Sequence, residues 1–305
     1  MSRHIVVGSV SELPVGADFD SRHERASALV QRAARLGANV LAFPETYHHT
    51  GLSGSVEEQA QPLDGPSLAR MAQEAKKHAL HLVWPLYTFE DGRIYNSSVL
   101  IGPDGERIGV YHKMFPTDGE IKSGITPGDG PRVFETELGR FGLTICFDMN
   151  FPEIMQGTAD AGAEVIFFSS AYRGGLQARI WAFLTGTYFV TAILGPGGQI
   201  VDLSGQLLVE STYEALITRR LNLDRKLLHM DYNWDKMDAI LAKYGPKVSI
   251  DFYTPEACWA IGSESEDFTV DDIIREFGLE KRFDYFRRSR EIRWEALAGR
   301  REGEQ

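Results

Sequence analysis

The chain opens with the apolar run Ile5-Val6-Val7-Gly8-Ser9-Val10, and a second run, Asn39-Val40-Leu41-Ala42-Phe43, follows it after a helix-like segment. That segment, residues 21–36, has apolar residues at the spacing of a helix face and ends at Gly37-Ala38. Two buried strands that flank an amphipathic helix form a β-α-β unit. The start of the chain therefore predicts a sheet that is covered by helices.

Paired strands follow this unit along the chain. Hairpins are predicted for residues 95–111, 132–145 and 199–209, because each contains two apolar runs around a glycine-containing turn. Further helices are expected at residues 66–80, 151–161 and 176–186. The mixture of β-α-β units and hairpins favours mixed α/β sheets over a purely parallel sheet. We expect one domain at residues 1–225 and a helical, irregular extension at residues 226–305, packed on the core or at a dimer interface.

Composition narrows the class of protein. The chain has 305 residues and a formal net charge of −11, which disfavours nucleic acid and anionic membranes as partners. Two cysteines, Cys146 and Cys258, do not make a disulfide framework, and no role is assigned to Cys258. The N-terminal residues enter a strand-like run at once, and no apolar stretch has the length of a membrane span. We expect a cytoplasmic protein.

Three polar residues each follow an apolar run: Glu45, Lys113 and Cys146. A carboxylate, an ammonium and a thiol brought together by strand ends could form a cysteine-hydrolase site. Asn150 is expected to cap the helix that follows Cys146, and this helix start with a nearby ammonium should lower the pKa of the thiol. The alternative for each residue taken singly is ordinary: a buried inert cysteine, or a charged residue at the surface.

Taken together, these segments resemble the nitrilase, or carbon–nitrogen hydrolase, superfamily. The resemblance rests on Leu41-Ala42-Phe43-Pro44-Glu45, Tyr111-His112-Lys113 and Ile145-Cys146-Phe147-Asp148, supported by Phe151-Pro152-Glu153 and by the hairpin near residue 202. It covers residues 4–225. It implies a four-layer α-β-β-α sandwich that commonly pairs across helices, so that a homodimer or a higher homo-oligomer is expected.

The resemblance also implies roles for individual residues. Glu45 would be the general base, Cys146 the nucleophile, and Lys113 with the backbone N–H of Phe147 the oxyanion site. Glu120 is the candidate for the second glutamate of the family. Neither a metal nor another cofactor is expected. The candidate substrate-binding residues are Tyr47, His49, Asn150, Tyr172 and Arg173.

Two departures from the family pattern concern the substrate. Asn150 stands where the family often has arginine, although Arg173 could compensate, and the segment at residues 170–190 looks shortened. Phe147-Asp148 does not match the pattern of true nitrilases. The expected function is hydrolysis of a small linear amide through a thioester. The alternatives are hydrolysis of an N-carbamoyl amine or amino acid, and a catalytically weak binding protein that retains the fold.

Overall fold

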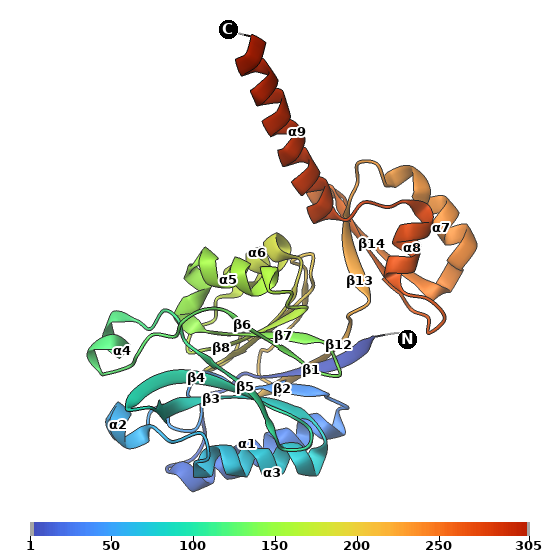
Figure 1. Ribbon diagram of the computed structural model, residues 1–305. Coiled ribbons are helices and arrows are strands. Elements are labelled where there is room, and N and C mark those ends of the chain that lie inside the picture. The colour runs from blue at the N-terminus through green and yellow to red at the C-terminus, as the bar shows by residue number, and fades with distance from the viewer. Residues whose placement is uncertain (1–2, 304–305) are drawn as a thin grey trace. The chain divides into compact units, whose positions relative to one another are not determined.

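The computed structural model describes residues 3–303, which fall into two compact units, Ile5–Leu221 and a second formed by residues 222 onward with the N-terminal residues up to His4. The first unit contains two six-stranded sheets (Figure 1). The first sheet has the order β12 (Leu216–Asn222), β1 (His4–Val10), β2 (Val40–Ala42), β3 (His81–Glu90), β4 (Arg93–Ile101) and β5 (Arg107–His112). The second has the order β11 (Leu207–Glu210), β10 (Gln199–Val201), β9 (Tyr188–Ile193), β8 (Val165–Ser170), β7 (Arg140–Ile145) and β6 (Arg132–Glu135).

Helices cover the outer face of each sheet, and the sheets stack on each other, as Figure 1 shows. Helices α1 (Phe19–Arg35) and α3 (Pro66–His78) lie on the first sheet, and α5 (Pro152–Asp160) and α6 (Gly175–Thr185) lie on the second. The short helices α2 (Val56–Gln59) and α4 (Asp118–Lys122) lie in loops. The predicted α-β-β-α sandwich and its mixed sheets are therefore confirmed, with parallel pairing from β1 to β3 and from β7 to β9.

The outer layers are held by apolar side chains of alternate strand residues. Leu82, Trp84 and Leu86 of β3 belong to the cluster that α1 and α3 complete, whereas Val83 between them faces the other sheet. Each such side chain stabilises the fold by about 1.5–3 kcal/mol when fully buried. Between the sheets, the Ser9 hydroxyl donates to the Thr191 carbonyl at 2.7 Å.

The second unit is built around a three-stranded antiparallel sheet with the order β13 (Arg225–His229), β15 (Cys258–Ser263) and β14 (Val248–Tyr253). Its helices are α7 (Met237–Tyr244), α8 (Val270–Phe277) and α9 (Arg282–Gly303). The C-terminal segment is thus helical as expected, but it also contains a sheet that the sequence reading did not include. Trp259 and Ile261 of β15 pack with α7 and α8, so that the second unit has its own hydrophobic core. The proposed division into a hydrolase domain and an extension stays a prediction.

One long segment and one helix start differ from their predictions. Residues 113–131, predicted as a single loop, contain α4, because Thr117 and Glu120 form a capping box. The prediction that Asn150 caps α5 is wrong: residues 146–150 form a 3₁₀ turn, η1 (Cys146–Asn150), and the cap residue of α5 is Phe151. Within the described residues, no helix is both long and apolar enough to cross a membrane.

Asp148 joins the ends of β5 and β7. Its carboxylate is fully buried and accepts hydrogen bonds from the Tyr111 hydroxyl at 2.7 Å, the Phe115 amide at 2.9 Å and the Ile145 amide at 3.0 Å. Burial raises the pKa of Asp148 to about 6, although these hydrogen bonds act in the opposite direction. The contact fixes the spacing between the segment after β5 and the turn after β7.

We expect Asp148→Asn to destabilise the protein most at low pH. A carboxyl group whose pKa is raised on folding adds stability at low pH, and that contribution is lost as the pH rises through about 6. A shift of about two pKa units corresponds to about 3 kcal/mol. The difference in the free energy of unfolding between wild type and variant should therefore narrow by up to that amount from about pH 4 to about pH 8. Denaturant unfolding at both pH values measures it. Asp64→Asn, at an exposed position, is the control, and a gap independent of pH would contradict the assignment.

Candidate active site

The ends of three strands bring the predicted residues together. Glu45 lies three residues after β2, Lys113 directly follows β5, and Cys146 directly follows β7 as the first residue of η1. The Lys113 amide donates to the Asn96 carbonyl at 2.8 Å, which extends the pairing of β4 and β5 by one residue. The position of each candidate is therefore set by the sheets and not by flexible loops.

Lys113 lies between two carboxylates. Its ammonium donates to Glu45 Oε1 at 2.8 Å and to Glu120 Oε1 and Oε2 at 3.0 and 2.8 Å. Lys113 is 1% exposed and Glu45 is 6% exposed. Burial acts to lower the pKa of Lys113, but the acidic groups of Glu45, Cys146 and Glu120 raise it above its ordinary value. The side chain is accordingly an ammonium at neutral pH.

Glu120 is presented by the first turn of α4. Its amide donates to the Thr117 hydroxyl oxygen at 3.3 Å, and its Oε2 accepts from the Thr117 amide at 2.8 Å. Burial acts to raise the pKa of Glu120, but Lys113 and hydrogen bonds from Thr117 and Asn96 bring it below its ordinary value. The capping box thus fixes a carboxylate that remains ionised beside the ammonium.

Cys146 adopts an unusual backbone conformation. Its φ is +47°, and Thr46, the residue after Glu45, has a φ of +48°. Residues other than glycine rarely occupy this region, and such residues are concentrated at functional sites. The strand-to-turn junction therefore presents the thiol from a sharp bend.

The Cys146 thiol is protonated at neutral pH. Burial and the negative charge of Glu45 raise its pKa to about 12, against the opposing effect of Lys113. The prediction that the helix start would lower this pKa is wrong, because burial and the adjacent Glu45 carboxylate raise it and η1 is only a short 3₁₀ turn. A thiol of this kind needs a base that removes its proton as it reacts, and Glu45 is within hydrogen-bonding reach of it.

The predicted substrate-binding residues lie in different surroundings. Tyr47 is fully buried against Phe43 and Trp84, and its hydroxyl donates to Glu12 at 2.5 Å. The buried ring of His49 packs on Tyr87 with 4.4 Å between ring centroids. Burial and the charges of Glu120 and Glu45 raise the pKa of Tyr87 to about 12, which places Tyr87 beside the carboxylates.

The other three candidates belong to the side of Cys146 that is formed by η1, α6 and the loop after β8. Asn150 accepts from Gln177 at 2.9 Å, and the Tyr172 hydroxyl donates to the other end of that amide at 3.3 Å. Burial raises the pKa of Tyr172 to about 12, and the Cys146 group contributes to this rise. Arg173 is exposed.

Several neighbours of the cluster were not selected by sequence reasoning. Asn96 donates to Glu45 and Glu120, the Ala171 amide donates to Glu45 Oε2 at 3.1 Å, and Gln177 joins Asn150 to Tyr172. One signal was present for Asn96: Asn96-Ser97-Ser98 places polar residues in a strand that is otherwise apolar, and a buried polar residue is informative.

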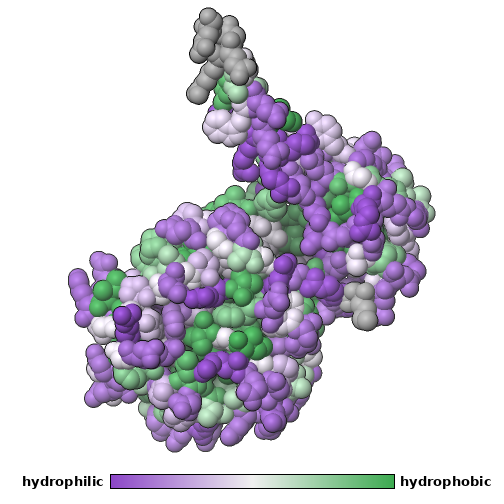
Figure 2. All heavy atoms as spheres, viewed as in Figure 1, coloured by the Kyte–Doolittle hydropathy of each residue, from purple (hydrophilic) through white to green (hydrophobic). Residues whose placement is uncertain are grey.

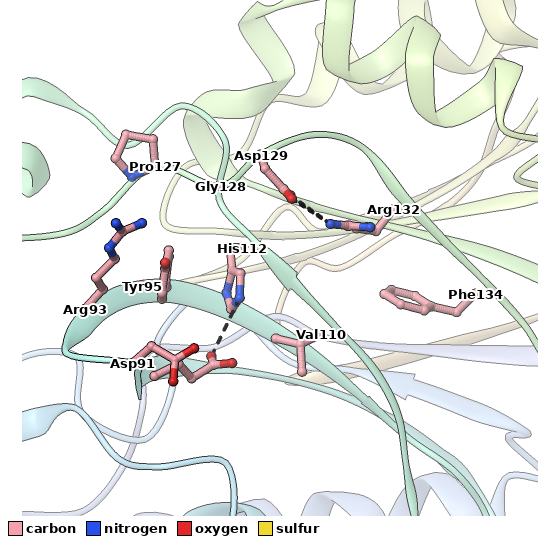
Figure 3. Close-up of a pocket in the computed structure, with 11 residues that line it drawn as sticks. Asp91, Arg93, Tyr95, Val110, His112, Pro127, Gly128, Asp129, Arg132 and Phe134 are labelled. Atoms are coloured by element: carbon pink, nitrogen blue, oxygen red, sulfur yellow. Dashed lines mark hydrogen bonds and ion pairs between the residues drawn. The ribbon is translucent and has the colours of Figure 1, made fainter.

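A separate cavity of about 460 Å³ lies near this site (Figure 3). Its lining includes Tyr95, His112, Arg93 and the pair formed by Asp129 and Arg132. His112 is stacked on Tyr95 and lies 3.6 Å from Glu90. None of the four residues predicted to be catalytic lines it. Because neighbouring residues of a strand point to opposite faces, Tyr95 lies on the face of β4 opposite Asn96.

Comparisons with known proteins agree with this architecture. Residues 7–206 match the family model for carbon–nitrogen hydrolases. Among curated relatives, the mouse (Mus musculus) omega-amidase NIT2 is 30% identical over 182 residues, which is 57% of this chain and 66% of the relative. The human (Homo sapiens) omega-amidase NIT2 is 30% identical over 169 residues, 52% of this chain and 61% of the relative. The matched part therefore spans less than two thirds of either relative.

Solved structures share the fold at lower identity. Nit3 of Saccharomyces cerevisiae, a member of branch 10 of the nitrilase superfamily, has a TM-score of 0.65 at 23% identity and covers 73% of this chain and 91% of its own. An amidase from Nesterenkonia sp. has a TM-score of 0.64 at 21% identity, with 80% and 97% covered. With the family model matching most of the sandwich, the chain belongs to the carbon–nitrogen hydrolase family.

Proposed function

We propose that this chain is a cysteine-dependent hydrolase that cleaves the C–N bond of a small linear amide. The observation that carries the proposal is the position of Cys146, which leaves β7 with a positive φ beside a buried cluster of Glu45, Lys113 and Glu120. An amide carbon is a poor electrophile, so it requires an activated nucleophile and a stabilised oxyanion. The relatives named omega-amidase support an amide as the substrate class.

The first half of the reaction forms a thioester. Glu45 takes the proton of the Cys146 thiol as the sulfur attacks the amide carbon, and the carbonyl oxygen becomes an oxyanion. Lys113 and the backbone N–H of Phe147 would bind that oxyanion, since an N–H in the first turn of η1 has no partner within the turn. When the C–N bond breaks, Glu45 returns the proton to the departing nitrogen, which leaves as ammonia or an amine.

The second half regenerates the thiol. Glu45 removes a proton from water, and the resulting hydroxide attacks the thioester carbon. The same donors bind the second oxyanion, and collapse releases the carboxylic acid. The departing sulfur recovers its proton from Glu45. Glu120 keeps Lys113 in place through both halves, because it accepts two hydrogen bonds from that ammonium.

An N-carbamoyl amine or amino acid is the second candidate substrate. Arg173 favours it, because this exposed arginine lies two residues after Ala171, whose amide binds Glu45. An arginine at the mouth of a site is suited to a substrate carboxylate. The third possibility is a binding protein with little catalysis. It is excluded if the wild-type protein turns over a substrate and Cys146→Ala does not.

The exposed face of α6 supports a homodimer or a higher homo-oligomer. Leu176, Ile180 and Leu184 are four residues apart on this helix and are 71%, 45% and 47% exposed. Figure 2 shows hydrophobic atoms on the side of the sandwich where α5 and α6 lie. A stripe of this kind on a helix is apt for an isologous contact with the same helix of a second copy.

The covalent step is tested by intact mass. Wild-type protein incubated with small amides should gain the mass of the acyl group, and Cys146→Ala should gain none and lose at least about 1,000-fold in turnover, because the nucleophile is removed. Cys258→Ala is the matched control, since Cys258 is the other cysteine of the chain and lies in β15. An adduct that persists in Cys146→Ala, or turnover that does, would refute the assignment.

The substrate class is tested by a panel of primary amides, amides with a distal carboxylate and N-carbamoyl compounds, scored by ammonia release. We expect neutral linear amides to have a higher kcat/KM than their N-carbamoyl analogues.

If Arg173 binds a carboxylate, Arg173→Ala should raise KM about tenfold or more for the carboxylate-bearing members of this panel alone, as loss of a charge-assisted contact would. Arg219→Ala, at an exposed position of β12, is the control. Preference for carbamoyl compounds would favour the second candidate.

Oligomer formation is tested by Ile180→Glu with light scattering. A charge placed in an apolar contact should shift the protein to monomer at micromolar concentration, because the charge would lose its water on assembly. Leu241→Glu is the control, since Leu241 lies on α7 and is 43% exposed, close to the value of Ile180. A monomeric wild type, or an Ile180→Glu variant that assembles normally, would contradict this role of α6.

A further inference from the structure

Asn96 occupies a central position in the candidate site, and the inference about it rests on the function proposed above. It lies in β4, is 1% exposed, and its side-chain amide donates to Glu45 Oε1 at 2.8 Å and to Glu120 Oε1 at 2.7 Å. Glu45 and Glu120 come from different parts of the chain, after β2 and in α4. One amide group therefore contacts both carboxylates of the cluster.

The orientation of this amide is fixed by its partners. Ionised carboxylates only accept hydrogen bonds, so the NH₂ end of Asn96 must face them. Its carbonyl, Oδ1, is then turned away and is buried without a hydrogen-bond partner among the described residues. An orphaned buried acceptor costs stability. This orientation lowers the stability of the fold locally, but it lets the side-chain amide of Asn96 donate to both carboxylates.

The two oxygens of Glu45 have different neighbours. Oε1 accepts from both Lys113 and Asn96, whereas Oε2 accepts from the Ala171 amide. The Ala171 amide also lies next to the Cys146 thiol, which places Oε2 on the side of the sulfur. Because two donors already occupy Oε1, Oε2 is the oxygen with room for the proton of the thiol.

The donors of Lys113 are fully engaged in the resting site. An ammonium has three N–H groups, and the three contacts of Lys113 go to Glu45 and Glu120. To bind an oxyanion, Lys113 must withdraw at least one of them while two carboxylates remain beside a single positive charge. A neutral donor that holds both carboxylates at that moment prevents them from separating or taking up protons.

We propose that Asn96 is a positioning residue that holds Glu45 Oε1 and Glu120 while Lys113 turns to the oxyanion, so that Glu45 Oε2 takes the thiol proton. Asn96 does not touch the reacting atoms. Its effect on the reaction passes through Glu45, Glu120 and Lys113. The role predicts a loss in the chemical step and a change in pH dependence, neither of which follows from simple packing.

The test compares Asn96→Ala and Asn96→Asp with Ser98→Ala. Ser98 is the matched control, because it lies two residues along the same strand, is fully buried, and has a hydroxyl without a partner among the described residues. On the best amide of the panel, kcat of Asn96→Ala should fall about 10- to 100-fold, as expected for hydrogen bonds to charged groups, with KM within about threefold. Ser98→Ala should match wild type in both.

The second measurement needs no substrate: the rate at which iodoacetamide alkylates Cys146, followed by mass from about pH 3 to about pH 9, a range that includes the titration of carboxyl groups. The Asn96 hydrogen bond acts to lower the pKa of Glu120, so its loss in Asn96→Ala should move the acid limb of this profile to higher pH. In Asn96→Asp, a protonated carboxyl can still donate one hydrogen bond, so its alkylation and turnover relative to wild type should recover as the pH falls. Thermal unfolding of each variant accounts for any loss of folded protein.

The outcomes separate the two proposals. If wild type hydrolyses no amide or carbamoyl compound, the proposed function fails, but the alkylation profiles still decide the role of Asn96. If wild type is active and folded Asn96→Ala has the kcat and the alkylation profile of wild type, the positioning role is overturned. An equal loss in Ser98→Ala would overturn it as well, because the effect would then belong to packing of β4.

Discussion

The site depends on keeping one ammonium and two carboxylates charged in a place that water hardly reaches. Charges in such a place are costly unless they are paired and hydrogen-bonded. Here the pairing is close to complete: Lys113 binds both carboxylates, and Asn96 and backbone amides supply further donors. Strand ends can hold these groups without added flexibility. The sandwich therefore provides the rigid, buried positions that these charged groups need in order to stay paired.

This constraint explains the state of the thiol. In many reactive cysteines a positive neighbour produces a stable thiolate. In this site burial and the negative charge of Glu45 outweigh the positive charge of Lys113, so the pKa of Cys146 is high. Such a thiol stays protonated at rest and reacts when an electrophile arrives and Glu45 can take its proton. The arrangement favours general-base catalysis over a permanently charged nucleophile.

Strand periodicity and strand ends are local signals, and they predicted mixed sheets covered by helices and a possible meeting of Glu45, Lys113 and Cys146. The resemblance to the family added the four-layer sandwich and Glu120. Sequence reasoning assigned no role to Asn96, whose partners Glu45 and Glu120 lie 51 and 24 residues away. It assigned none to Asp148 either, whose partners are Tyr111, 37 residues away, and the nearby Ile145 amide. It misjudged the cap at Asn150, because this residue ends the 3₁₀ turn and its side-chain amide donates to the Phe147 carbonyl at 3.0 Å. The C-terminal sheet was missed although Val248-Ser249-Ile250-Asp251-Phe252 in β14 alternates apolar and polar residues. Its central strand, β15, pairs with both β13 and β14, and the pairing with β13 joins segments that are far apart in the chain.

The hydrogen bonds around Cys146 fall into two sets that share few members. Glu45, Lys113, Glu120 and Asn96 bind one another, whereas Asn150, Tyr172 and Gln177 form a separate chain on the turn after β7 and on α6. Residues in the second set can be exchanged without removing any contact of the first. A fold divided in this way permits its choice of substrate to drift over evolutionary time while the bond-breaking apparatus stays intact.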